Sequence, residues 1–267
     1  MPVITLTTDF GLVDEYVGVM KGVMLSIHPQ ADIVDISHEI APQNIHQAAF
    51  MLASAYPYFS AGTIHVVVVD PGVGTHRRIV CLQKKGYRFL APDNGVLTRV
   101  LDQGPVDSAW WVENPAYWMD DVSQTFHGRD IFAPVAAHLS KGLESHHLGR
   151  ELDPTTLIRL PDMVPGINEN GDIKGCIVTV DRFGNLITNI DAKLISEMNT
   201  GHKSKNLILE VAGQSISGLS LNYDAQREGH PLVLVNSRGY LEIAVNKGSA
   251  TDIFKVGMGE PVKVTYK

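Results

Sequence analysis

The chain has 267 residues, of which 44% are apolar and 19% are charged, and its formal net charge is −7. This is the composition of an ordinary globular protein, and it excludes the disordered and fibrous classes. Because the acidic balance provides no basic surface for a phosphate backbone or an anionic bilayer, we expect neither nucleic acid nor a membrane as a partner.

We do not expect the first residues of the chain to form a signal peptide. Residues 1–9 contain no basic region and reach the carboxylate of Asp9 before an apolar segment could form. No apolar run approaches the roughly 18 residues needed to span a bilayer. The two cysteines, Cys81 and Cys176, are too few for a disulfide framework and lack the paired spacing of a zinc or redox motif. We therefore expect a soluble protein in the reducing cytoplasm.

The first 160 residues alternate apolar strands with amphipathic helices. Residues 3–8 form a short β-branched strand, and Asp14 is placed to cap a helix that runs to Ile27, where His28-Pro29 ends it. The same alternation predicts strands at 33–36 and 64–69, a hairpin at 79–82 and 87–90, and helices at 45–56, 95–101 and 131–140. Strand 64–69 is apolar nearly throughout, which is typical of a sheet covered on both faces. Residues 1–160 are therefore predicted to form an α/β domain with a mostly parallel sheet.

The pattern changes after a segment rich in proline, glycine and asparagine. We expect a linker at 161–172, because periodicity is weak there and Pro161 and Pro165 break it. Short strands separated by Gly and Asn follow, at 175–180, 186–190, 207–211, 232–236, 241–245 and 262–266. Residues 173–267 are therefore predicted to form a smaller all-β domain, a barrel or a sandwich.

Two carboxylates follow predicted strands of the first domain directly, Asp9 after strand 3–8 and Asp70 after strand 64–69. Ligands of parallel sheets gather at the carboxyl ends of the strands, so both positions are candidates for a site. Asp9 and Asp14 could accept hydrogen bonds from the vicinal hydroxyls of a ribose. The alternative is that Asp9 is a turn residue and Asp14 only a helix cap.

The segment 69–78 has the most informative local sequence. Gly72 and Gly74 allow peptide N–H groups to line a small cavity, yet neither a dinucleotide-binding nor a Walker pattern is present. A tight turn with solvated Arg77 and Arg78 is the structural alternative. Further along, His127 stands beside Gly128 at a helix entrance and could donate a hydrogen bond into a site. A metal centre would draw on Asp9, Asp70, His38 and His127, but no ligand spacing supports one.

Two turns of the second domain carry hydrogen-bonding side chains, at 181–185 and 236–240. Phe183 could stack on a planar base whose edge Asn185 reads, and Ser237 with Arg238 could hold a carboxylate. Such chemistry describes a nucleoside attached to an amino acid. The alternative is that both segments are simple hairpin turns.

Five motifs in this order resemble those of one family, the adenosine-forming S-adenosylmethionine hydrolases, also called S-adenosylmethionine hydroxide adenosyltransferases, which are related to fluorinase and chlorinase. The motifs are Thr8-Asp9-Phe10-Gly11, Asp70-Pro71-Gly72-Val73-Gly74-Thr75 with Arg77, Phe126-His127-Gly128-Arg129-Asp130, Asp181-Arg182-Phe183-Gly184-Asn185 and Asn236-Ser237-Arg238-Gly239. The resemblance covers nearly the whole chain.

The resemblance implies a homotrimer whose sites lie between the first domain of one subunit and the second domain of its neighbour. It implies the following site residues: Asp70, Arg77 and His127 as a catalytic triad, Asp9 for the ribose, Phe183 and Asn185 for adenine, and Asp14, Asp181, Ser237 and Arg238 for the methionine portion. The halogenases carry an aromatic residue at the position of Asp70 and a serine at that of Gly128, so this chain is expected to use water instead of halide. Gln43 stands where the fluorinase packs an aromatic ring on the ribose.

The implied reaction is attack of an activated water or hydroxide on C5′ of S-adenosyl-L-methionine, which yields adenosine and L-methionine. Methionine leaves as a neutral thioether, so no general acid is needed. Arg77 would favour hydroxide, while Asp70 and His127 would orient the nucleophile and accept its proton. We expect no metal or redox cofactor, since S-adenosylmethionine is the substrate. The alternatives are a nucleoside-binding regulatory module without turnover and a metal-dependent hydrolase.

Overall fold

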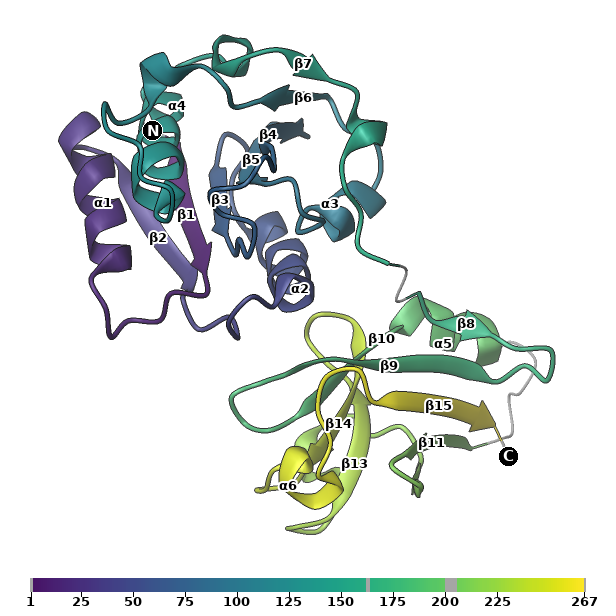
Figure 1. The fold of residues 1–267 in the computed structure, drawn as a ribbon. Helices are drawn as coiled ribbons and strands as arrows, with labels where there is room; N and C mark the ends of the chain where they lie inside the picture. Colours follow the sequence, from purple (N-terminus) through teal and green to yellow (C-terminus); the bar gives the residue numbers. More distant parts are fainter. Residues whose placement is uncertain (1, 162–163, 200–205, 267) are drawn as a thin grey trace. The chain divides into compact units, whose positions relative to one another are not determined.

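The structure is a computed structural model that describes residues 2–161, 164–199 and 206–266. The chain divides into two compact units, 1–160 and 161–267, which are coloured in sequence order in Figure 1. Among the described residues, none of the helices combines the length and the apolar character that crossing a bilayer would require.

The first unit is built on one mixed sheet of seven strands in the order β2-β1-β3-β5-β4-β6-β7. Its strands are β1 (Val3–Thr8), β2 (Asp32–Ser37), β3 (Ile64–Val68), β4 (Ile79–Lys84), β5 (Tyr87–Pro92), β6 (Ser108–Trp111) and β7 (Glu151–Leu152). Its α-helices are α1 (Tyr16–Ile27), α2 (Ile45–Ala55), α3 (Thr98–Asp102) and α4 (Ala133–Ser140). Strands β2, β1, β3, β5 and β6 run in one direction and β4 and β7 in the other, because the last three pairings are antiparallel. The prediction of a mostly parallel sheet is confirmed at this level.

Helices cover both faces of this sheet, as the apolar sequence of β3 predicted. Val66 and Val68 pack in one core cluster with α1 and α4, and Val67 and Val69 pack in another with α2 and α3. Alternate residues of a strand point to opposite faces, so an uninterrupted apolar run is stable only where both faces are buried. The two pairs of helices lie on either side of the sheet in Figure 1.

The beginning of α1 corrects one sequence-based prediction. The residue that precedes the helix is Glu15, which makes no side-chain capping hydrogen bond, and Asp14 is exposed in the loop before it. Asp14 is therefore not the helix cap. A capping residue must lie immediately before the first helical residue to reach the free N–H groups of the first turn. The helix begins at Tyr16, so Asp14 lies one residue too far from it.

The second unit contains an antiparallel sheet in the order β12-β11-β15-β9-β10-β14-β13, with β8 paired to β9. The strands are β8 (Gly166–Ile167), β9 (Ile173–Val180), β10 (Leu186–Asp191), β11 (Leu207–Val211), β12 (Gln214–Ser217), β13 (Pro231–Val235), β14 (Tyr240–Val245) and β15 (Pro261–Tyr266). A bridge between Ser220 and Leu234 brings the two edges together, so the sheet is barrel-like and nearly closed. Helices α5 (Ala192–Asn199) and α6 (Ala250–Phe254) are additions that the strand pattern did not predict. Strand β8 lies within the segment expected to be a linker.

Three hairpins of this unit have the same type of turn. In each, an Asx side chain accepts hydrogen bonds from the backbone N–H groups two and four residues later, with a glycine at positive φ between them. The turns begin at Asn168, Asp181 and Asn236. The repeated bonding explains why Asp and Asn stand at the first position, since their side chains satisfy the turn's own backbone.

Candidate active site

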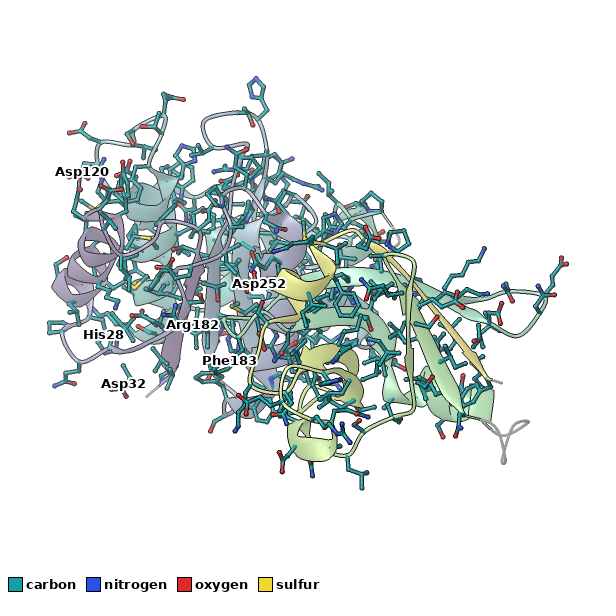
Figure 2. All side chains as sticks on the ribbon, turned by 90° about the horizontal axis from the view of Figure 1, so that it is seen from below. His28, Asp32, Asp120, Arg182, Phe183 and Asp252 are labelled. Carbon is teal, nitrogen blue, oxygen red and sulfur yellow. The ribbon has the colours of Figure 1, made fainter. Side chains whose placement is uncertain are left out.

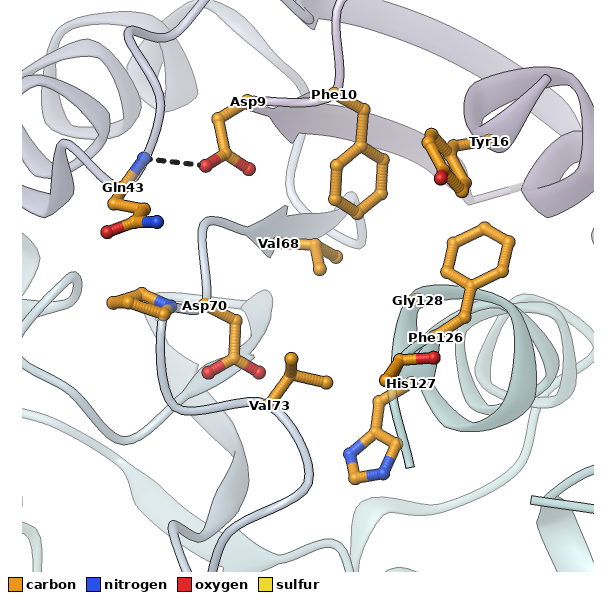
Figure 3. Close-up of a pocket in the computed structure, with 12 residues that line it drawn as sticks. Asp9, Phe10, Tyr16, Gln43, Val68, Asp70, Val73, Phe126, His127 and Gly128 are labelled. Carbon is orange, nitrogen blue, oxygen red and sulfur yellow. Dashed lines mark hydrogen bonds between the residues drawn. The ribbon is translucent and has the colours of Figure 1, made fainter. Parts of the chain in front are cut away.

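A pocket of about 380 Å³ opens at the carboxyl ends of β1 and β3. These two strands are parallel neighbours, whereas β2, which comes between them in the sequence, lies on the far side of β1. The pocket therefore lies at a point where the strand order reverses, the usual ligand position in such sheets. It is lined by Asp9, Phe10, Tyr16, Gln43, Val68, Asp70, Pro71, Val73, Thr125, Phe126, His127 and Gly128 (Figure 3).

Asp70, Arg77 and His127 form one hydrogen-bonded group. Arg77 donates from Nε and Nη2 to Asp70 Oδ2, at 2.7 and 2.5 Å, and its Nη2 lies 2.8 Å from Nδ1 of His127. The side chains of Asp70 and Arg77 are almost fully buried. Asp70 and His127 line the pocket and Arg77 does not, so the guanidinium supports the other two from behind.

The arginine fixes the protonation of the histidine. A guanidinium can only donate hydrogen bonds, so Nδ1 of His127 must be the acceptor, and the neutral ring carries its proton on Nε2. Burial lowers the pKa of His127 below its ordinary value, and the charge of Arg77 acts in the same direction. His127 is therefore neutral near pH 7, and the nitrogen that could accept a proton is already bonded to Arg77.

Asp70 has the free acceptor of the group. Its Oδ1 is buried and has no hydrogen-bond partner among the described residues, while Oδ2 receives both bonds from Arg77. A buried carboxylate oxygen without a donor costs free energy, so a site that keeps one is suited to a polar ligand. Asp70 lines the pocket, so the unpaired oxygen belongs to a pocket-lining side chain, although the atom itself is covered from solvent.

Two loops meet closely behind the pocket. Gly74 has a φ of +77°, and a Cβ added there would lie 2.3 Å from the backbone carbonyl oxygen of Gln124. The loop that contains Gln124 is held by buried Asp130, whose Oδ2 accepts from the backbone N–H and the hydroxyl of Ser123. The loop after β3, which carries Asp70, and the loop that carries His127 are therefore packed directly against each other.

Asp9 is held at the opposite side of the pocket from Asp70 (Figure 3). Its Oδ2 accepts a 2.8 Å hydrogen bond from the backbone N–H of Gln43, a residue with a φ of +64°. Phe10 and Tyr16 each meet Phe126 edge to face along another wall, and their own two rings are tilted against each other. Sequence reasoning did not predict this aromatic wall, although Phe10 and Phe126 stand inside two of the motifs.

The second unit has a pocket of its own, of about 650 Å³. Phe183 and Asn185 line it together with Tyr223, Val245, Lys247, Gly248 and Ser249. The ring of Phe183 is 76% exposed and lies beside Arg182 at the turn between β9 and β10 (Figure 2). Both residues expected to contact adenine thus line one cavity, where the exposed ring is available for stacking.

The other predicted residues of the second unit lie in the turns themselves. Asp181 accepts hydrogen bonds from the N–H groups of Phe183 and Asn185 and from the Asn185 side chain, so it braces the 181–185 turn. Ser237 and Arg238 are exposed on the 236–240 turn. Asp14 is exposed on the first unit and does not line its pocket.

Arg78 differs from the solvated residue that the local sequence suggested. It donates from Nε and Nη2 to the buried carboxylate of Asp93 and from Nη2 to the carbonyl oxygen of Thr156. Arg78 therefore ties the end of the first unit to its sheet. In the part of the chain that the structure describes, no three His, Cys, Asp or Glu side chains are grouped to hold a metal ion.

Comparison with known proteins gives two family matches that together span most of the chain. Residues 4–149 match the SAM hydroxide adenosyltransferase N-terminal domain, and residues 175–263 match the SAM hydroxide adenosyltransferase C-terminal domain.

Individual relatives match over their full length. A protein of Salinispora arenicola named (R)-S-adenosyl-L-methionine hydrolase is 36% identical over 265 residues, covering 99% of this chain and 98% of the relative. A protein named fluorinase from Actinoplanes sp. is 29% identical over 290 residues, covering 99% of this chain and 97% of the relative. The crystal structure of an uncharacterized conserved protein from Thermotoga maritima is 37% identical, with a TM-score of 0.91 over 98% of this chain and 99% of that one.

Proposed function

The chain belongs to the SAM hydroxide adenosyltransferase family, and we propose that it hydrolyses S-adenosyl-L-methionine to adenosine and L-methionine. The observation that carries this proposal is the hydrogen-bonded group formed by Asp70, Arg77 and His127, in which Asp70 lines the pocket and keeps one buried oxygen without a partner among the described residues. The Salinispora arenicola relative, which bears the hydrolase name, aligns with 99% of this chain.

In the proposed mechanism Asp70 is the group that handles the attacking water. Its Oδ1 accepts the hydrogen bond of the water and takes its proton as the oxygen attacks C5′. Arg77 holds Oδ2 and Nδ1 of His127, so the carboxylate cannot rotate, and its positive charge stabilises the developing hydroxide. The bond from C5′ to sulfur breaks as the bond from oxygen forms, and methionine leaves as a neutral thioether. His127 acts here by position and not as the base, because its acceptor nitrogen faces Arg77.

The remaining substrate contacts are proposed from the family motifs. Asp9 binds the ribose, Phe183 and Asn185 bind adenine, and Asp14, Asp181, Ser237 and Arg238 serve the methionine portion. These residues belong to two units, and we propose that they meet between subunits of a cytoplasmic homotrimer. No cofactor takes part in this proposal.

The decisive experiment is to incubate the purified protein with S-adenosylmethionine and to resolve the products by chromatography. We expect equal amounts of adenosine and methionine, with activity unchanged in excess EDTA. Absence of adenosine after long incubation with ample enzyme would leave a nucleoside-binding module as the better description. Loss of activity in EDTA and its recovery with one divalent metal would instead favour a metal-dependent hydrolase.

The stereochemistry at sulfur is a second question for the same assay. The relative's name specifies the (R) form of S-adenosyl-L-methionine. The two sulfonium epimers should therefore be supplied separately, and faster release of adenosine from the (R) epimer is the result we expect for this chain.

A further inference from the structure

A buried carboxylate of the second unit, Glu242, has no place in the proposed reaction. It lies on β14, where the neighbouring Leu241 and Ile243 point into the core of the barrel. Glu242 therefore faces the outer side of the sheet, yet it is only 3% exposed. Burying a carboxylate is costly compared with burying an apolar side chain, so its contacts require an explanation.

Both oxygens of Glu242 accept a hydrogen bond from residues that shape the substrate contacts. Oε1 accepts from the hydroxyl of Tyr223 at 2.9 Å, and Oε2 accepts from Nδ2 of Asn236 at 3.0 Å. Tyr223 lines the pocket of Phe183 and Asn185, while Asn236 begins the turn that carries Ser237 and Arg238. Burial raises the pKa of Tyr223 to about 12, so its hydroxyl remains a donor at neutral pH.

The bond to Asn236 also determines which way its amide group faces. A carboxylate can only accept, so Glu242 selects the orientation in which Nδ2 points toward it. Oδ1 then points into the turn, where it accepts from the N–H groups of Arg238 and Tyr240 at 2.9 and 3.2 Å. In the opposite orientation Oδ1 would face the carboxylate, and both turn N–H groups would lose their acceptor.

We propose that Glu242 is a positioning residue that holds Tyr223 and the 236–240 turn in the shape needed to bind substrate. Its influence falls on binding, since the proposed reacting groups Asp70, Arg77 and His127 all belong to the other unit. This inference rests on the proposed function where it is tested by turnover, because KM and kcat presuppose hydrolysis of S-adenosylmethionine. The Kd for adenosine can be measured without turnover and tests the role of Glu242 separately.

The test compares Glu242→Met, which removes both acceptors, with Glu242→Gln. Glutamine can accept a hydrogen bond from Asn236 and donate one to the hydroxyl oxygen of Tyr223, so Glu242→Gln should retain substrate binding. For Glu242→Met we expect KM for S-adenosylmethionine and Kd for adenosine to rise about tenfold, with kcat within about threefold of wild type. Glu242→Gln should stay within about threefold on all three quantities. The matched control is Glu210→Met, which removes a partly exposed glutamate of β11 outside the pocket of Phe183.

Several outcomes would overturn the inference. One is a folded Glu242→Met protein whose KM for S-adenosylmethionine and Kd for adenosine equal those of the wild type. The others are a rise of KM and Kd in Glu210→Met, or in Glu242→Gln, as large as the rise in Glu242→Met. If Glu242→Met does not fold, Tyr223→Phe carries the test, because it removes one of the two bonds and should weaken adenosine binding severalfold. A wild-type protein that binds adenosine but releases none from S-adenosylmethionine overturns the proposed function alone, and the Kd comparison still decides the role of Glu242.

Discussion

At the scale of single residues, Arg77 has the clearest test. It contacts Asp70 and His127 but does not line the pocket, so its removal should affect the reaction more than substrate binding. Arg77→Lys retains the charge but cannot make the forked contact to both partners. We expect turnover to fall on the order of 10²-fold, with the affinity for S-adenosylmethionine changed less than about threefold. Single-turnover kinetics and equilibrium binding measure the two quantities separately.

The control for this experiment must be chosen from the structure. Arg78, the adjacent arginine, is unsuitable because it bonds buried Asp93 and Thr156, so its loss would destabilise the unit. Arg227 is exposed in a loop of the second unit and lines neither pocket, so Arg227→Lys serves instead. A defect of Arg77→Lys confined to substrate affinity would remove Arg77 from the proposed catalytic group.

At the scale of structural elements, the contact between two loops controls the arrangement of the triad. Asp70 lies in the loop after β3, and His127 immediately precedes the π-helical turn Gly128–Phe132, which leads into α4. Packing at Gly74 and Gln124 joins these loops, and Asp130 braces the second one through Ser123. The distance from Arg77 to His127 therefore depends on a contact that neither loop makes alone.

A glycine substitution tests this dependence. In Gly74→Ala the new Cβ would lie 2.3 Å from a backbone carbonyl, so one loop must move. We expect kcat to fall by at least about tenfold and the free energy of unfolding to fall by about 2 kcal/mol or more. Gly62→Ala is the matched control, because Gly62 also has positive φ, at +96°, but nothing lies within 4 Å of the added Cβ. Urea unfolding and steady-state kinetics report both effects, and equal losses in the two variants would contradict the loop contact.

At the scale of the whole molecule, one buried histidine links stability to pH. His65 of β3 is 1% exposed, and burial lowers its pKa from 6.5 to about 4. Between these values the unfolded chain binds a proton that the folded chain does not, so stability is fully present above pH 6.5 and falls as the pH falls toward 4. We expect the free energy of unfolding at pH 5 to be about 2 kcal/mol below that at pH 7.

Urea titrations at several pH values check this prediction. His65→Gln keeps a hydrogen-bonding group near Thr5, the partner of His65 Nδ1, but cannot titrate, so its stability should change much less over this range. His76→Gln removes an exposed histidine and should keep the wild-type slope. If His65→Gln retained the full slope, the acid sensitivity would arise elsewhere.

Association is the second property of the whole molecule. Each unit exposes large apolar side chains, with Val13 98% exposed in the first and Leu221 99% exposed in the second. Exposed apolar groups favour burial against another chain. For the proposed homotrimer we expect sedimentation to give a mass of three chains, with activity lost on dilution below the association range. An active monomer would refute the assignment of the site to two subunits.

Local sequence patterns were sufficient to predict the two-domain architecture of the chain, and the motifs were sufficient to select the three residues of the proposed triad. An uninterrupted apolar run such as 64–69 indicates a strand buried on both faces, and the parallel pairing of β1 and β3 then brings Asp9 and Asp70 to the same end of the sheet. The motifs identified Asp70, Arg77 and His127, and the structure brings them into contact.

The pairing of the polar groups could not be predicted from the sequence, because it follows from how distant segments pack. Arg77 meets His127 across 50 positions, and Arg78 reaches Thr156 across 78, so neither pairing leaves a mark in the local sequence. Glu242 interrupts an apolar run between Leu241 and Ile243, which is a visible signal, yet its contact with Tyr223 depends on where the chain before β13 folds over the sheet. The pattern of apolar residues predicts how deeply a side chain is buried, because burial depends on many neighbours and not on any single contact. A hydrogen bond requires two particular atoms about 3 Å apart, and that distance is set only when loops distant in the sequence have packed together.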